Sequence, residues 1–147
     1  MSLARIVFLN QFQRDTQALR DSLVGLTQNQ LVDPSFDTES TLAERLALVA
    51  AHYYREGEVL AHQAGQQFDP PMDDDTLWHL EAIRSRYDWT LSELEADLED
   101  AWAFYGELLR GVSESDYLAY MQRHHGLLPR PAYELSREIS VWRMRNR

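Results

Sequence analysis

The 147-residue sequence contains no cysteine and no lysine. The lack of cysteine excludes disulfides, cysteine-ligated zinc, iron–sulfur clusters and thiol nucleophiles. The lack of lysine excludes a Schiff-base lysine and the lysine of a phosphate-binding P-loop. The 14 permanently charged basic side chains are therefore all arginines, and the sequence also contains five histidines.

Basic residues are also outnumbered, because 24 acidic residues give a net charge of −10. Nucleic-acid binding depends on clustered cations that contact phosphates, so we expect no nucleic-acid partner. No window approaches the roughly 18 consecutive apolar residues of a membrane-spanning helix, so we expect no membrane partner. The first residues lead directly into a polar amphipathic stretch rather than a signal peptide, and we expect a cytoplasmic protein.

Large apolar side chains are plentiful, with four Trp, seven Tyr and five Phe in a sequence that is 44% hydrophobic. That supply is enough for one hydrophobic core without covalent cross-links. The length fits a single domain, and no repeat or long linker divides the chain, so residues 1–147 are predicted to form one domain.

Apolar residues recur at three-to-four spacing, which is typical of amphipathic helices, and no stretch alternates as a strand does. Long helices are predicted over about residues 4–26, 41–63 and 90–111, and a last one starts at Pro131. Shorter helices are predicted within residues 73–83 and 113–121. The predicted fold class is all-α: a four-helix bundle with a long crossover between the second and third long helices and short extra helices.

Helix starts are marked by capping residues. A Ser or Thr followed three residues later by Glu, Gln or Asp satisfies the free backbone N–H groups of a first turn. This pattern begins at Thr27, Thr41, Thr90 and Ser113. Pro131 suits the first position of a helix, where its missing N–H is not needed.

The segment from Thr41 to Ala51 resembles the start of the second helix in the DinB-like superfamily of helical bundles, which typically reads (S/T)-I-x-E-x-L-x-H. A first helix that ends near Gly25, a long crossover and the Ile139-Ser-Val-Trp142 pattern are also similar to that family. Residues 76–117 look most like the branch that includes the colibactin self-resistance proteins. The resemblance implies a four-helix bundle along essentially the whole chain.

Members of that superfamily often bind a divalent metal through one histidine on the second helix and an H-x-x-x-H pair on the fourth. The corresponding positions here are Leu48, Pro131 and Leu135. None of these side chains can ligate a metal. The resemblance therefore implies the family's fold without its metal triad, and we expect no metal ligands and no cofactor.

Other polar side chains could still form a pocket. His52 and Glu56 lie one turn apart on the second helix, and could be two ligands, or a base and its orienting carboxylate. Glu134 and Glu138 lie one turn apart on the last helix, and with His52 could form a site for a divalent transition metal. Alternatively, His52 and Glu56 lie at the wet edge of the bundle, and the two glutamates pair with arginines on the surface. With Tyr53, these four residues form the candidate pocket.

The tandem His124-His125 resembles a ligand pair, but adjacent side chains on a loop rarely point at one ion, so we interpret it as a loop feature. The many aromatic side chains, Tyr105 among them, could line a hydrophobic ligand cavity or simply form the core.

Two functional hypotheses follow. The first is a DinB-like bundle without the metal triad that acts as a small-molecule-binding or self-protection protein. The second is a metal-dependent hydrolase or thiol transferase with rearranged ligands. Whether the chain is an enzyme stays open, and the resemblance together with the aromatic content makes a homodimer plausible.

Overall fold

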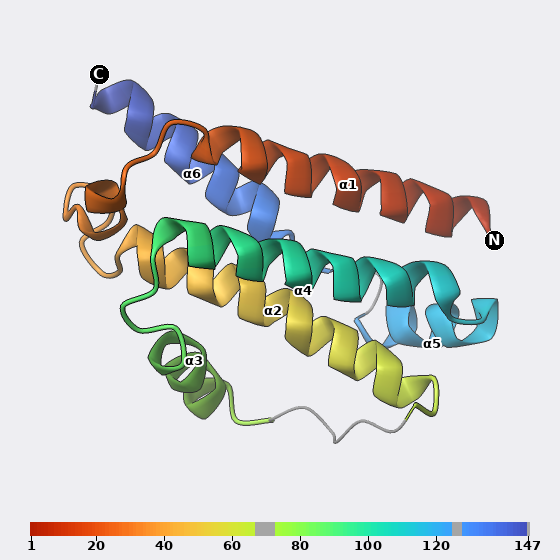
Figure 1. Cartoon of the computed structure of the whole chain (residues 1–147). Coiled ribbons are helices and arrows are strands. Elements are labelled where there is room, and N and C mark those ends of the chain that lie inside the picture. Colours follow the sequence, from red (N-terminus) through yellow and green to blue (C-terminus); the bar gives the residue numbers. More distant parts are fainter. Residues whose placement is uncertain (67–72, 125–127, 147) are drawn as a thin grey trace.

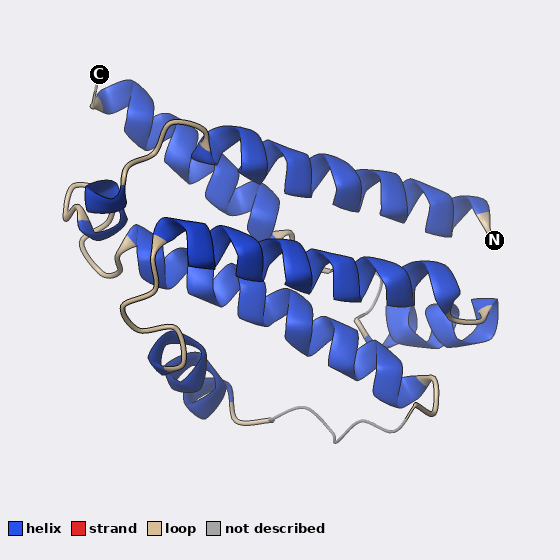
Figure 2. Ribbon diagram, viewed as in Figure 1, coloured by secondary structure: helices blue, strands red, loops and turns tan. Residues whose placement is uncertain are grey.

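The computed structural model describes residues 1–66, 73–124 and 128–146 of the chain. These residues form six α-helices and one 3-10 helix, with no strand among them (Figure 2). The all-α class and the bundle architecture predicted from the sequence are confirmed.

Four long helices form the bundle: α1 (Leu3–Leu23), α2 (Leu42–Gln63), α4 (Leu91–Gly111) and α6 (Pro131–Arg145). The first and last helices lie beside each other, and α2 lies along α4, so the bundle consists of two packed pairs (Figure 1). The α1–α6 pair joins the two segments that are farthest apart in the sequence.

Three short helices complete the structure: η1 (Gln28–Val32), α3 (Asp75–Arg84) and α5 (Glu114–Arg123). The predicted crossover is present, because the chain passes from α2 through α3 to α4, and α3 packs against α2 (Figure 1). The α5 helix packs on α2 as well, near the end of α2 that is farther from η1.

The predicted caps start these helices. The hydroxyls of Thr41, Thr90 and Ser113 accept hydrogen bonds from backbone N–H groups at distances of 3.1, 3.2 and 3.1 Å. At Thr27, the backbone N–H donates to Gln30 Oε1 at 2.8 Å. Pro131 is the first residue of α6, as expected.

The end of α1 differs from the prediction, because the helix stops at Leu23 rather than near Leu26. Gly25 has a φ of +81°, a left-handed conformation that ends a helix and that glycine adopts without strain. The Arg143 guanidinium on α6 also donates to the carbonyl oxygens of Ser22 and Val24, both at 2.8 Å. A contact with the far end of the chain therefore fixes this helix end.

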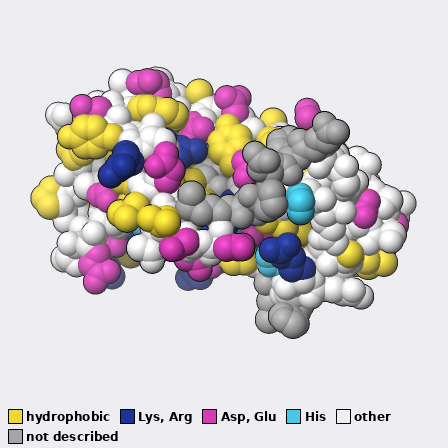
Figure 3. All heavy atoms as spheres, turned by 90° about the horizontal axis from the view of Figure 1, so that it is seen from below, with side chains coloured by type: hydrophobic (Ala, Val, Ile, Leu, Met, Phe, Trp, Pro, Cys, Tyr) yellow, Lys and Arg dark blue, Asp and Glu magenta, His cyan; other side chains and the backbone are white. Residues whose placement is uncertain are grey.

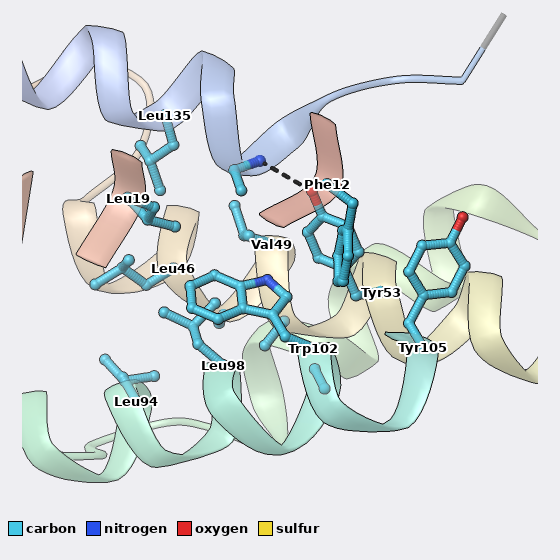
Figure 4. Packing of buried hydrophobic residues seen from close by; sticks show 14 of the residues in the cluster. Phe12, Leu19, Leu46, Val49, Tyr53, Leu94, Leu98, Trp102, Tyr105 and Leu135 are labelled. Atoms are coloured by element: carbon cyan, nitrogen blue, oxygen red, sulfur yellow. Dashed lines mark hydrogen bonds between the residues drawn. The ribbon is translucent and has the colours of Figure 1, made fainter. Parts of the chain in front are cut away.

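The core lies along the seam where the four long helices meet. Leu19, Leu46, Leu98 and Leu135 come one from each long helix, and none is more than 1% exposed. Figure 4 shows these side chains pointing toward one another, with the Trp102 ring and the Tyr53 ring beside them. This seam follows the leucine stripes predicted from the sequence.

Arg5, near the start of α1, is almost completely buried at the end of α4. Its guanidinium donates to the carbonyl oxygens of Leu109 and Val112, both at 2.7 Å. The last carbonyls of a helix lack partners within the helix, and the helix dipole favours a cation there. Arg5 thereby fixes the start of α1 to the end of α4.

None of the helices in the described part of the chain is long and apolar enough to cross a membrane.

Candidate functional site

Three of the predicted pocket residues lie on the inner side of α2. Tyr53 is buried, and the side chains of His52 and Glu56 are partly buried beside it. The His52 ring meets the Tyr53 ring edge-on, with centroids 5.3 Å apart. Burial lowers the pKa of His52 below its ordinary value, and the nearby Glu56 carboxylate only partly opposes that effect. His52 is therefore a neutral imidazole near pH 7.

Glu56 lies at the end of a chain of hydrogen-bonded hydroxyls. Its side chain is only 12% exposed, and Oε2 accepts a hydrogen bond of 2.6 Å from the Tyr120 hydroxyl. The Tyr120 and Tyr105 hydroxyl oxygens are 2.8 Å apart. A hydroxyl has one hydrogen, and that of Tyr120 is used for Glu56, so Tyr105 must donate to Tyr120. The three hydrogen-bonded residues come from three different helices: Tyr105 from α4, Tyr120 from α5 and Glu56 from α2.

The phenols of this region stay protonated. Burial is the largest cause of a raised pKa at Tyr53, Tyr105 and Tyr120. A protonated phenol donates one hydrogen bond, and the direction of the Tyr105–Tyr120–Glu56 chain is therefore fixed.

His124, at the end of α5, also approaches the Glu56 carboxylate. Its Nε2 atom lies 3.1 Å from Oε2 of Glu56, and its ring meets that of Tyr120 with centroids 5.0 Å apart. The distance suits an ion pair, but the angles do not make a hydrogen bond, so Nε2 is buried without a hydrogen-bonding partner among the described residues. The second residue of the predicted tandem, His125, lies outside the described residues.

An ion pair between a buried carboxylate and a partly exposed arginine lies nearby, between α1 and the start of α6. The carboxylate of Asp15 on α1 accepts two hydrogen bonds from Arg130, at 3.0 Å from Nε and 2.8 Å from a terminal guanidinium nitrogen. Asp15 is 5% exposed, whereas the Arg130 side chain is 40% exposed. Arg130 directly precedes α6, so the pair fixes the start of that helix against α1.

His52, Tyr53, Glu56, Tyr105 and the Asp15–Arg130 pair border one hollow, which we call the interior hollow. Its volume is about 20 Å³, room for roughly one water molecule. It opens beside the partly exposed side chains of Phe8 and Gln11 and the exposed Pro129. Its remaining lining residues are Phe12, Asp15, His52, Tyr53, Glu56, Tyr105, Leu128 and Arg130.

Glu134 and Glu138 are exposed and line a different surface depression, which we call the α6 groove. This groove has a volume of about 510 Å³ and runs between α6 and residues 35–37. Glu138 pairs there with Arg45, as the surface alternative predicted. The structure therefore brings together His52, Tyr53 and Glu56, and places Glu134 and Glu138 in the α6 groove instead.

The three positions that the sequence resemblance aligned with metal-binding histidines carry apolar side chains in this structure. Leu135 is completely buried in the core, Leu48 is partly buried, and Pro131 begins α6. The described residues contain no group of three or more His, Asp or Glu side chains arranged to hold one metal ion.

The sequence analysis did not predict that Asp15 and Arg130 line the interior hollow or that Tyr120 binds Glu56. Asp15 and Arg130 are 115 residues apart, and Tyr120 is 64 residues from Glu56. The only available signal was local: Tyr117 and Tyr120 are one turn apart on α5 and share its buried face.

Neither a family model, nor a curated protein, nor a solved structure matches this chain. The functional argument therefore depends on the site itself.

Proposed function

We propose that this protein is a DinB-like, cytoplasmic small-molecule-binding bundle that uses the interior hollow without a metal ion. The observation that carries the proposal is the Glu56 carboxylate, which is largely buried on the core side of α2 and borders a hollow that opens to solvent. A buried carboxylate is costly unless donors compensate it, so such groups concentrate at functional sites.

The arrangement around Glu56 supports a binding role. The Tyr105–Tyr120 chain holds one carboxylate oxygen in a fixed orientation, and neutral His52 supplies a second polar group at the same hollow. Small-molecule sites typically combine apolar and aromatic walls with a few fixed polar groups, which is the composition of this lining.

The size of the hollow restricts what can enter it. One polar group of about one heavy atom fits beside Glu56, and the rest of a ligand must extend outward past Gln11 and Pro129. The resemblance to the self-resistance branch suggests sequestration of a harmful small molecule as the corresponding biological role.

Ligand-observed NMR with a library of small polar molecules tests this proposal. We expect binders of the wild-type protein to lose affinity for the Glu56→Gln variant, because glutamine keeps the shape of the side chain and removes its charge. Glu134→Gln is the matched control, since it makes the same change on the exposed face of α6. Binders that depend on Glu134 and not on Glu56 would place the site in the α6 groove and contradict the proposal.

Elemental analysis of protein purified without added metal tests the metal-free part. We expect no transition metal above trace. One equivalent of bound metal that is lost in His52→Ala would instead favour the metal-dependent hydrolase or thiol transferase.

A further inference from the structure

The charged side chains that line the interior hollow indicate which charge a ligand should have. Its lining contains two carboxylates, Asp15 and Glu56, and one guanidinium, Arg130. The Asp15 and Arg130 charges neutralise each other through two hydrogen bonds. With His52 neutral, the lining keeps one excess negative charge, and that charge lies on Glu56.

No cation in the described lining offsets this charge by a hydrogen bond. Among the described residues, the hydrogen-bond donor to Glu56 is the neutral Tyr120 hydroxyl, and His124 contacts the same oxygen without hydrogen-bonding geometry. Arg55, one residue before Glu56, pairs with Asp75 on α3 instead. A cationic hydrogen-bond donor inside the hollow would complete the surroundings of Glu56.

The walls of the hollow favour a cation as well. Phe12, Tyr53 and Tyr105 pack against one another with ring centroids 5.4 to 5.7 Å apart (Figure 4). Aromatic faces carry negative electrostatic potential and attract ammonium groups within about 6 Å of the ring centroid. An anionic head group would be repelled by the Glu56 carboxylate.

Size selects among cations. A volume of about 20 Å³ accommodates a primary ammonium, which is close to a water molecule in size, and is too small for a quaternary ammonium.

The surface of the protein adds a long-range attraction for cations, since the chain has a net charge of −10 and acidic side chains are spread over the face shown in Figure 3.

We propose that the interior hollow binds the ammonium head of a primary amine, with Glu56 as its counter-ion. This inference depends on the proposed function, because it names the ligand class of the same site. The ammonium enters beside Gln11, donates to the Glu56 carboxylate and lies against the rings of Phe12 and Tyr53. The carbon chain of the amine leaves the hollow past Pro129.

The test titrates four probes into the wild-type protein at pH 7. Three are linear four-carbon molecules with different head groups, n-butylamine, n-butanol and sodium butyrate, and the fourth is the quaternary cation tetramethylammonium, as its chloride. Two-dimensional NMR of the imidazole groups locates the binding. We expect n-butylamine to shift the His52 and His124 resonances and to leave His62 and His79 unchanged. Binding of the other three should be at least tenfold weaker.

Two variants then test whether the Glu56 carboxylate is the counter-ion of the bound ammonium. Glu56→Gln should weaken n-butylamine binding at least tenfold, and Glu134→Gln should leave it unchanged. Circular dichroism checks that Glu56→Gln is folded; if it is not, the wild-type probe comparison still decides the ligand class.

The outcomes separate the two proposals. If n-butanol or butyrate shifts His52 in a Glu56-dependent manner and n-butylamine does not, the amine inference is wrong and the binding site stands. Equal binding of tetramethylammonium also overturns the inference, because the hollow would then not select by size. If no probe shifts His52 or His124, and library binders ignore Glu56→Gln, both proposals fail.

Discussion

At the residue scale, Tyr120 links the Tyr105 hydroxyl to the Glu56 carboxylate. It is completely buried, donates to Glu56 and accepts from Tyr105. Removing its hydroxyl leaves a buried acceptor and a buried donor without their partner, and each unsatisfied group costs roughly 1–3 kcal/mol.

With two such groups, we expect Tyr120→Phe to lower the free energy of unfolding by about 2 kcal/mol or more in urea denaturation. Tyr117→Phe is the matched control: Tyr117 is buried on the same helix, and its hydroxyl makes no hydrogen bond with another described residue. Equal losses in the two variants would show that the hydroxyl chain contributes nothing specific.

The stability contributed by His52 depends on pH in a defined direction. Burial lowers the pKa of His52 in the folded protein, so the unfolded chain binds a proton more readily. The contribution is complete above the unfolded pKa of about 6.5 and is lost as pH falls below it.

Between pH 7 and 5.5 we expect the unfolding free energy of the wild type to fall more steeply than that of His52→Gln. His79→Gln serves as the control, because His79 is exposed on α3. Identical slopes for wild type and His52→Gln would contradict the prediction.

At the scale of the elements, the close approach of α2 and α4 depends on Gly57. A Cβ atom at this position would lie 2.5 Å from Cε2 of Phe104, which is too short for any real contact. Gly111, at the end of α4, has no atom within 4 Å of the corresponding position.

The two glycines should therefore respond oppositely to alanine. Alanine has the higher helix propensity, by up to about 1 kcal/mol, and Gly111→Ala should stabilise by about 0.5–1 kcal/mol. Gly57→Ala should destabilise by about 1–2 kcal/mol, because overpacking of about 1–3 kcal/mol outweighs the propensity gain. Thermal unfolding measures both, and stabilisation by Gly57→Ala would mean that Phe104 moves aside freely.

Some helix ends could be predicted from the sequence and others could not. The caps at Thr41, Thr90 and Ser113 were predictable, because each helix start depends on residues three positions apart. The end of α1 was not, because Arg143 contacts it from the other end of the chain. The site divides in the same way: His52 and Glu56 share a helix face, whereas Tyr120, Asp15 and Arg130 reach them only through the folded bundle.

At the scale of the whole molecule, the first turns of α1 leave apolar side chains in solvent. Leu3, Ile6 and Val7 are 75%, 42% and 53% exposed. Contiguous exposed apolar surface is typical of association sites, and the DinB-like resemblance makes a homodimer our expectation.

Sedimentation velocity should therefore detect a dimer, and Ile6→Glu with Val7→Glu should convert it to a monomer. Val32→Glu is the control, since Val32 is equally exposed on η1, away from this face. A wild-type monomer at high concentration would rule out the dimer.

The pairing of α1 with α6 has a consequence for synthesis of the protein in the cell. Of these helices, the ribosome makes α1 first and α6 last. The nascent chain can therefore pack α1 against α4, but α6, the main packing partner of α1, does not yet exist at that stage. The nascent chain can complete its bundle only once residues 131–145 have emerged. Until then, we expect the side of α1 that packs against α6 to remain exposed to solvent.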